Sequence, residues 1–236
     1  METVSPYISL FFGATTLLTV FFFYRAANNS RLTLFVLSGW LLLQAIIGLS
    51  GFYTVTDRMP PRLMLLLLPP IIFIAVLFLS PAGKKYLADL NIKTLTILHI
   101  VRIPVEVVLL FLLLHKAIPK GMTFEGHNFD IISGITAPLV YYFGLMRNQL
   151  NTKIILVWNF ICLGLLINIV VTAIFSVPAP FQRFGFEQPN IAILYFPFIW
   201  LPGCVVPLVL LSHLATIKKL LQTIQKKKQD LAIQNA

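Results

Sequence analysis

The apolar positions of this chain gather into seven long stretches that few charged residues interrupt. They cover residues 7–24, 32–55, 63–82, 93–115, 131–146, 153–177 and 191–213. A helix that crosses the hydrocarbon core of a bilayer needs about 20 mainly apolar residues, and these stretches approach or exceed that length. The pattern predicts an all-α, polytopic integral membrane protein built as a bundle of seven transmembrane helices.

The composition agrees with a membrane protein and excludes several other classes. Apolar residues make up 58% of the chain and charged residues only 11%, whereas a soluble domain carries about 25% charged residues. So few charges cannot cover a soluble globule of 236 residues. The same composition excludes a disordered chain and a nucleic-acid binder, whose basic residues would lie on a water-facing patch. We expect a multi-pass protein of a bacterial-type inner or plasma membrane, with the lipid bilayer as a partner and no nucleic acid.

The Lys and Arg residues between the stretches predict how the chain is oriented. With the N-terminus outside, the cytoplasmic loops and the tail hold twelve of these residues, and the outer loops hold five. Cytoplasmic segments carry the excess of Lys and Arg in membrane proteins. The N-terminus is therefore predicted outside and the C-terminus in the cytoplasm.

The chain divides into a predicted transmembrane domain, residues 1–216, and a basic cytoplasmic tail, residues 217–236. The apolar residues of the tail recur at helical spacing between lysines, and they are Ile217, Leu220, Leu221 and Ile224. Such an amphipathic helix would continue the seventh stretch and lie along the anionic lipid of the cytoplasmic leaflet. A solvated anchor after the last span is the alternative.

The fourth stretch carries the strongest functional signal, three ionisable residues on one helical face. His99, Arg102 and Glu106 lie within about 60° of each other around an ideal helix. Ionisable residues at membrane depth usually face the bundle interior and serve function. The alternative is a structural ion pair between Arg102 and Glu106, which are spaced i, i+4. Pro104 lies away from this face and frees the carbonyl of Ile100, which predicts a local kink.

Two amides are expected at the depth of Glu106. Gln44 in the second stretch and Asn168 in the sixth each lie about 20 Å from the cytoplasmic end of their stretch. They are candidate ligands of a substrate or ion, with a hydrogen bond between helices as the alternative. Asn159 lies about 180° from Asn168 around the same helix, so only one of these two can face the same cavity.

The loop before the fifth stretch, residues 122–130, is dense in polar and ionisable side chains. Glu125, His127 and Asp130 are predicted over the outer mouth of a cavity floored by the fourth stretch, where they would bind a cation or relay protons. His127 and Asp130 are also weak candidates for metal ligands. The structural alternative is that Asn128 or Asp130 caps the next helix.

The seventh stretch carries Pro197, Pro202 and Pro207 at intervals of five residues. Interrupted membrane helices expose backbone carbonyls that coordinate ions or substrates in secondary transporters. Adaptation of helix packing is the alternative, because proline is tolerated in membrane helices.

These observations favour a small-solute or proton- or cation-coupled carrier or channel. Glu106 would accept the proton or cation, Arg102 would be its counter-charge or an anion clamp, and His99 would be the inner relay. The partner is then a small molecule or an ion, no cofactor is predicted, and an oligomer is compatible with the sequence.

Three other function classes stay open. An intramembrane enzyme acting on a lipid or another apolar substrate would use Glu125, His127 and Asp130 as acid–base groups or metal ligands at the outer mouth. A haem or redox protein would need His99 and His213, the histidine pair at one depth on different stretches. A receptor or a structural subunit of a membrane complex would use the lysine-rich tail as its contact, and no residue argues specifically for it.

Overall fold

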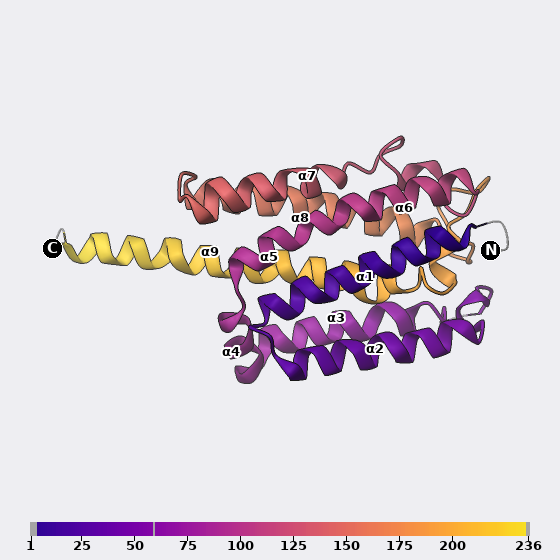
Figure 1. Cartoon of the computed structure of the whole chain (residues 1–236), viewed down its shortest axis with the longest axis horizontal. Helices are drawn as coiled ribbons and strands as arrows, with labels where there is room; N and C mark the ends of the chain where they lie inside the picture. Colours follow the sequence, from indigo (N-terminus) through magenta and orange to yellow (C-terminus); the bar gives the residue numbers. More distant parts are fainter. Residues whose placement is uncertain (1–3, 59, 235–236) are drawn as a thin grey trace.

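The computed structural model of the chain describes residues 4–58 and 60–234. Within these ranges the chain is mostly helical and contains no β-strand, which confirms the all-α prediction. The helices run side by side along the long axis of the molecule, and the C-terminal helix projects beyond the others at one end (Figure 1).

In the described ranges, five helical segments are long and apolar enough to cross a membrane. They are α1 (Pro6–Ala26), α2 (Arg31–Leu49), the unit of α5 (Ile92–Leu98), the 3₁₀ turn η2 (His99–Val101) and α6 (Arg102–Leu114), then α8 (Thr152–Phe175), and the π-helical turn η6 (Leu201–Val205) with α9 (Val206–Gln234). Helices of this length and apolar character are those of a membrane protein.

Two further predicted stretches are helical but differ in shape. α3 (Met64–Leu79) turns by 92° into α4 (Pro81–Asp89). Ser80 causes the turn, because its backbone is extended while its hydroxyl accepts the Gly83 N–H at the start of α4. α7 (Ile131–Leu139) and the π-helical η4 (Val140–Met146) together form a shorter apolar helix over the predicted residues.

The predicted start of the seventh stretch at residue 191 is wrong. Residues 191–199 form short turns, among them η5 (Ala192–Leu194), and the long helix begins with η6. Pro197 lies among these turns, whereas Pro202 lies in the first turn of η6, where the missing N–H of a proline costs no helical hydrogen bond.

The tail continues the last helix, as the sequence predicts. α9 runs through residue 217 to Gln234 without a break. Ile217 and Leu220 are buried, and the Lys219 ammonium donates to the Leu90 carbonyl before α5. The first turns of the tail therefore pack in the bundle, and the exposed remainder projects beyond it (Figure 1).

The structure has a 3₁₀ turn at the junction of α5 and α6, close to where Pro104 predicts a kink. There η2 tightens the helix into a 3₁₀ turn that contains Ile100, the residue whose carbonyl Pro104 frees. The unit nevertheless continues as one segment from Ile92 to Leu114. The tight turn lies at His99 and directly precedes Arg102, two of the three predicted ionisable residues.

The connection between α6 and α7 folds into the bundle. It contains η3 (Lys120–Met122) and a tight turn at Gly126, where a Cβ would lie 2.4 Å from the Lys120 carbonyl oxygen. Asn128 and Asp130 are buried. This loop therefore carries polar side chains into the depth of the bundle, beside α6.

α9 lies at the centre of the helix packing and α2 lies at its edge. α9 packs against α3, α4, α5 and α8, whereas α2 contacts α1, η6 and the short η1 (Phe52–Thr54) that follows it. The largest apolar core draws its buried side chains mainly from α1, α5, α6 and α9. The buried ionisable side chains lie where η2, α6, α7, α8 and α9 meet.

Candidate functional site

A connected set of buried polar side chains occupies the interior of the bundle, and we call it the buried network. Its members are His99, Arg102, Glu106, Asn128, Asp130, Asn159 and His213, each at most 6% exposed. Helical spacing places the first three on one face of η2 and α6, as predicted. The loop before α7, together with α8 and α9, supplies the others.

Arg102 forms its ion pair with Asp130 and not with Glu106. Its Nη1 atom donates to Asp130 Oδ1 at 2.8 Å and to the Cys162 carbonyl at 3.4 Å. The i, i+4 pairing of Arg102 with Glu106 is therefore wrong. Asp130 stands at the N-cap position of α7, but within the described chain its side chain makes no capping hydrogen bond. The carboxylate is turned toward the guanidinium instead, because the loop carries it into the bundle.

The close approach of α7 to α6 depends on Gly134. A Cβ at this position would lie 2.9 Å from the Ile103 side chain, 3.1 Å from the Ile103 backbone nitrogen and 3.3 Å from Arg102 Cβ. A larger residue would push α7 outward, since tightly packed interiors do not absorb an added carbon without moving. Gly134 therefore allows Asp130, four residues earlier, to reach Arg102.

His213 links the guanidinium to α8. Arg102 Nη2 lies 3.0 Å from His213 Nε2, and His213 Nδ1 lies 3.0 Å from Asn159 Oδ1. A guanidinium can only donate, so Nε2 accepts and the proton of a neutral His213 ring is on Nδ1, from which it donates to Asn159. Asn159 Nδ2 in turn donates to the Ile155 carbonyl at 2.9 Å. Both ring nitrogens of His213 are engaged in this arrangement.

His99 stacks on His213, so the two histidines that the sequence places at one depth are neighbours. The ring centroids lie 3.8 Å apart with an interplanar angle of 14°, and Trp158 meets the His99 ring edge-on. Neither ring nitrogen of His99 has a hydrogen-bond partner among the described residues. Stacked rings do not point their nitrogens at one another, and the described residues contain no group of three or more His, Cys, Asp or Glu that could hold a metal.

Glu106 lies at the other end of the buried network. Its Oε1 atom accepts a hydrogen bond from Asn128 Nδ2, which also donates to the Met122 carbonyl at 3.0 Å. Asn128 Oδ1 accepts the Asp130 backbone N–H at 3.0 Å and so ties Glu106 to the ion pair. In the part of the chain that the structure describes, no donor reaches Glu106 Oε2.

A small cavity of about 70 Å³ adjoins Glu106 and Asp130. Apart from these two residues its lining is apolar, with side chains from α3, α6, α8, η6 and α9, among them Leu67, Leu109, Leu166 and Val206. The cavity is large enough for one or two water molecules. It gives Glu106 a neighbouring space in an otherwise packed interior.

The structure does not bring the other predicted site residues to the buried network. Gln44 is buried in α2 and accepts a hydrogen bond from the Tyr53 hydroxyl at 2.6 Å. Asn168 is exposed and donates to the His127 carbonyl at 3.1 Å. Neither bond joins two transmembrane helices, which was the structural alternative: Tyr53 lies in η1 directly after α2, and His127 lies in the loop before α7. Glu125 and His127 are exposed in the loop, while Asp130 faces inward.

Asn159, Asn128 and His213 complete the buried network, although none was a first candidate. Asn159 and Asn168 lie about 180° apart around α8, so only one of them can face the interior. In the structure it is Asn159. The sequence places His213 at the same predicted membrane depth as His99, and this match indicated that the two could be neighbours. Asn128 lies in a loop, where no periodicity shows which side chains face inward.

One protein-family match covers residues 59–221, and its description is Domain of unknown function (DUF8737). The matched residues include every member of the buried network. No curated protein and no solved structure matches the chain.

Proposed function

The chain belongs to the family described as Domain of unknown function (DUF8737), and we propose that it is a proton-coupled carrier of a small solute whose proton-binding group is Glu106. In this proposal seven helices cross a bacterial-type inner or plasma membrane, with the N-terminus outside and the C-terminus in the cytoplasm. The excess of Lys and Arg in the loops and tail on the cytoplasmic side supports this orientation. In this orientation the projecting tail (Figure 1) carries its exposed lysines on the side of the anionic cytoplasmic leaflet, which attracts them.

The observation that carries the proposal is the half-partnered carboxyl of Glu106, which is buried in the bundle interior. Asn128 donates to one oxygen, within the described structure the other oxygen has no donor, and the residue lines the mostly apolar cavity. Burying an ionised carboxylate without a counter-charge is costly, whereas a protonated carboxyl needs no counter-charge. Glu106 is therefore suited to hold one proton at membrane depth.

The pairing of Arg102 with Asp130 leaves the charge of Glu106 without a cation of its own. One guanidinium then stands against two carboxyl groups in the buried network. Loss of the Glu106 proton would add one uncompensated negative charge to the interior. A rearrangement that admits water, a cation or a charged solute would relieve this charge. Proton binding at Glu106 would in this way shift the balance between two conformations of the carrier.

The stacked histidines extend the buried network away from Glu106. Arg102 contacts His213, and His99 covers the face of the His213 ring. The His99 nitrogens, which lack partners among the described residues, are free to take up a proton when the interior opens. In the proposed mechanism Arg102 is the counter-charge of Asp130, and His99 is the inner relay.

The outer-mouth enzyme has less support than the carrier. Glu125 and His127 are exposed, whereas Asp130 is buried and committed to Arg102. The three groups therefore do not present one shared site. A receptor or structural subunit likewise has no specific contact in its favour.

Infrared titration of purified protein tests proton binding without knowledge of the solute. The wild type should show a protonated carboxyl band at neutral pH that is absent from the Glu106→Gln variant. The matched control is Glu125→Gln, which removes an exposed carboxyl from the neighbouring loop and should leave the band in place. A band that persists in Glu106→Gln would refute the assignment.

Solute flux in proteoliposomes tests the coupling. Panels of labelled organic acids, amino acids and sugars are offered under an imposed pH gradient. A solute accumulated by the wild type and by Glu125→Gln should not be accumulated by Glu106→Gln. Gradient-driven uptake that is unchanged in Glu106→Gln would exclude Glu106 as the coupling group.

A further inference from the structure

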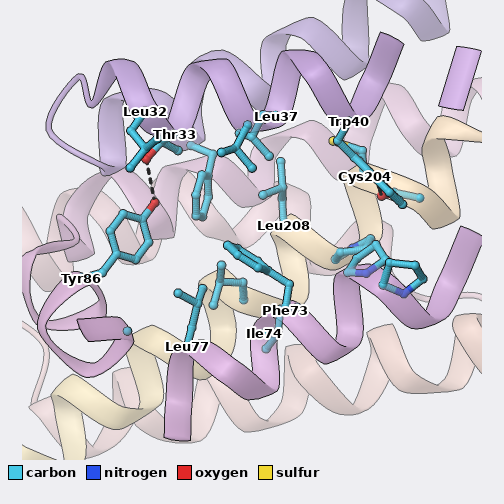
Figure 2. A pocket seen from close by; sticks show the side chains of 18 of the residues that line it. Leu32, Thr33, Leu37, Trp40, Phe73, Ile74, Leu77, Tyr86, Cys204 and Leu208 are labelled. Carbon is cyan, nitrogen blue, oxygen red and sulfur yellow. Dashed lines mark hydrogen bonds between the residues drawn. The ribbon is translucent and has the colours of Figure 1, made fainter. Parts of the chain in front are cut away.

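A large apolar groove lies on the side of α9 away from the buried network. It has a volume of about 600 Å³ and is lined by α2, α3, α4, η6 and α9, with one residue of α1. Figure 2 shows Leu37 of α2 facing Phe73 and Ile74 of α3 and Leu208 of α9 across it. This volume is within the range of pockets that hold drug-sized ligands. The groove exists because α2 packs mainly on α1, η1 and η6 and stays apart from α3.

The groove is closed at one end by a contact that proline creates. Pro207 has no N–H to donate to the carbonyl four residues earlier, which belongs to Gly203. The indole N–H of Trp40 donates to that carbonyl at 2.7 Å. A Cβ at Gly203 would lie 2.6 Å from the Leu66 side chain, so the glycine keeps η6 close to α3. Trp40 and Cys204 mark this end in Figure 2.

The opposite end of the groove is polar. Thr33 Oγ1 and Tyr86 Oη lie 3.1 Å apart, and the dashed line in Figure 2 marks their hydrogen bond. Ser80, at the turn between α3 and α4, also lines this end. The hydroxyls of Thr33 and Tyr86 can each turn to accept or donate a further hydrogen bond.

The groove is open along its side and long enough to hold part of one acyl chain. From Thr33 to Trp40 a helix rises about 10 Å, and one leaflet of the hydrocarbon core is about 15 Å thick. Its α2 and α3 rims stay accessible, since Leu32, Val36 and Phe73 are 73%, 44% and 52% exposed. The groove therefore opens sideways at membrane depth.

Basic residues adjoin, in the sequence, the residues that line the polar end. Arg31 precedes Leu32 and Thr33 on α2, and Lys84 and Lys85 lie beside Tyr86 on α4, all three with exposed side chains. Because α4 turns by 92° from α3, its lysines lie at the end of the bundle (Figure 1). In the proposed membrane orientation this end is at the level of the lipid headgroups. Positive charge at this position is complementary to an anionic headgroup.

We propose that this groove binds an anionic phospholipid, with one acyl chain between α2 and α3 and the phosphate beside Thr33 and Tyr86. Arg31, Lys84 and Lys85 provide the preference for negative charge, and the apolar lining holds the chain. The site is separate from Glu106, so it stands or falls independently of proton coupling.

Native mass spectrometry of protein extracted from vesicles tests the site. The vesicles contain equal amounts of phosphatidylglycerol and phosphatidylcholine, and the lipids that stay bound are counted per chain. The wild type should retain one lipid, with phosphatidylglycerol preferred about tenfold. The double variant Lys84→Gln/Lys85→Gln should lose this preference, whereas Lys227→Gln/Lys228→Gln on the projecting tail should keep it.

Filling the groove tests the position of the chain. Val36→Trp should abolish retention of both lipids, and Ile154→Trp, at a 55% exposed position on α8, should not. If Val36→Trp fails to fold, Thr33→Val/Tyr86→Phe takes its place and should weaken retention about tenfold. Unchanged preference in the lysine variant overturns the proposal, as does full retention in the groove variant. A lipid-free dimer that Val36→Trp dissociates would assign the groove to a second copy of the chain instead.

Discussion

Replacement of Asp130 by Asn is expected to destabilise the protein strongly, because it removes one half of a buried ion pair. The carboxylate lies 2.8 Å from Arg102 Nη1, and the two side chains are 8% and 3% exposed. Breaking such a pair from one side leaves an uncompensated buried charge and costs about 3–5 kcal/mol. Asn preserves the shape of Asp130, so the cost falls on the guanidinium. Its other contacts are to His213 and to the Cys162 carbonyl.

Glu106→Gln is the internal comparison, since it removes the other carboxyl of the buried network. The amide oxygen of Gln can still accept the hydrogen bond from Asn128, and no cation loses its partner. The free energy of unfolding should therefore change by about 1 kcal/mol or less. The Arg102→Met/Asp130→Leu double variant should recover most of the loss, because apolar residues replace a buried pair at little cost.

The assay is unfolding of the detergent-solubilised protein by a denaturing detergent, followed by tryptophan fluorescence. Trp158 lies at the edge of the His99 ring and reports on the buried network. The free energies of unfolding of the single and double variants are compared with the wild type. Equal losses for Asp130→Asn and Glu106→Gln would refute the assignment of Asp130 as the counter-ion of Arg102.

Three further sets of variants test other contacts described above. Gly134→Ala should lower the free energy of unfolding by about 1–3 kcal/mol, because the added carbon would contact Ile103. Gly164→Ala, where nothing described lies within 4 Å of the added carbon, should stabilise α8 slightly. Similar values for the two variants would contradict the packing argument. His213→Phe should lower the free energy of unfolding, measured by heat or denaturant, by about 1–3 kcal/mol, since it leaves Arg102 Nη2 without its ring acceptor. His99→Phe should fold normally but lose proton-driven uptake. Normal uptake by His99→Phe would exclude His99 as the inner relay. Trp40→Phe should lower the free energy of unfolding by about 1 kcal/mol, because it leaves the Gly203 carbonyl unpaired. The loss should be smaller in a chain that also carries Pro207→Ala, which restores the backbone donor. An equal loss in that chain would show that another group donates to the carbonyl.

The local periodicity of the chain was sufficient to predict the helices and one face of the site. Each predicted apolar stretch contains a helix, because a backbone in hydrocarbon has to satisfy its hydrogen bonds internally. His99, Arg102 and Glu106 share a buried face because the helical repeat fixes their directions. The same repeat showed that only one of Asn159 and Asn168 can face the interior. Pro104 indicated the position of the 3₁₀ turn at His99.

Contacts between distant segments were beyond the reach of periodicity. The i, i+4 rule offered Glu106 as the partner of Arg102, but the loop before α7 supplies Asp130 from 28 residues away. The direction of a loop side chain depends on how the whole loop packs, and Gly126 and Gly134 decide this through contacts with Lys120 and Ile103. The start of the last helix was mispredicted for a related reason, since the apolar composition of residues 191–199 does not distinguish short turns from a helix.

The sequence by itself therefore determined the apolar, membrane-protein character of the chain, its helical elements and the helical face on which its fourth stretch carries charge. These properties follow from composition and from the helical repeat, which act over a few residues. Only the tertiary structure decided that Asp130 neutralises Arg102, that Glu106 adjoins a cavity with one oxygen unpartnered among the described residues, and that a groove separates α2 from α3. These properties depend on which helices and loops meet, and residues far apart in the chain set them jointly.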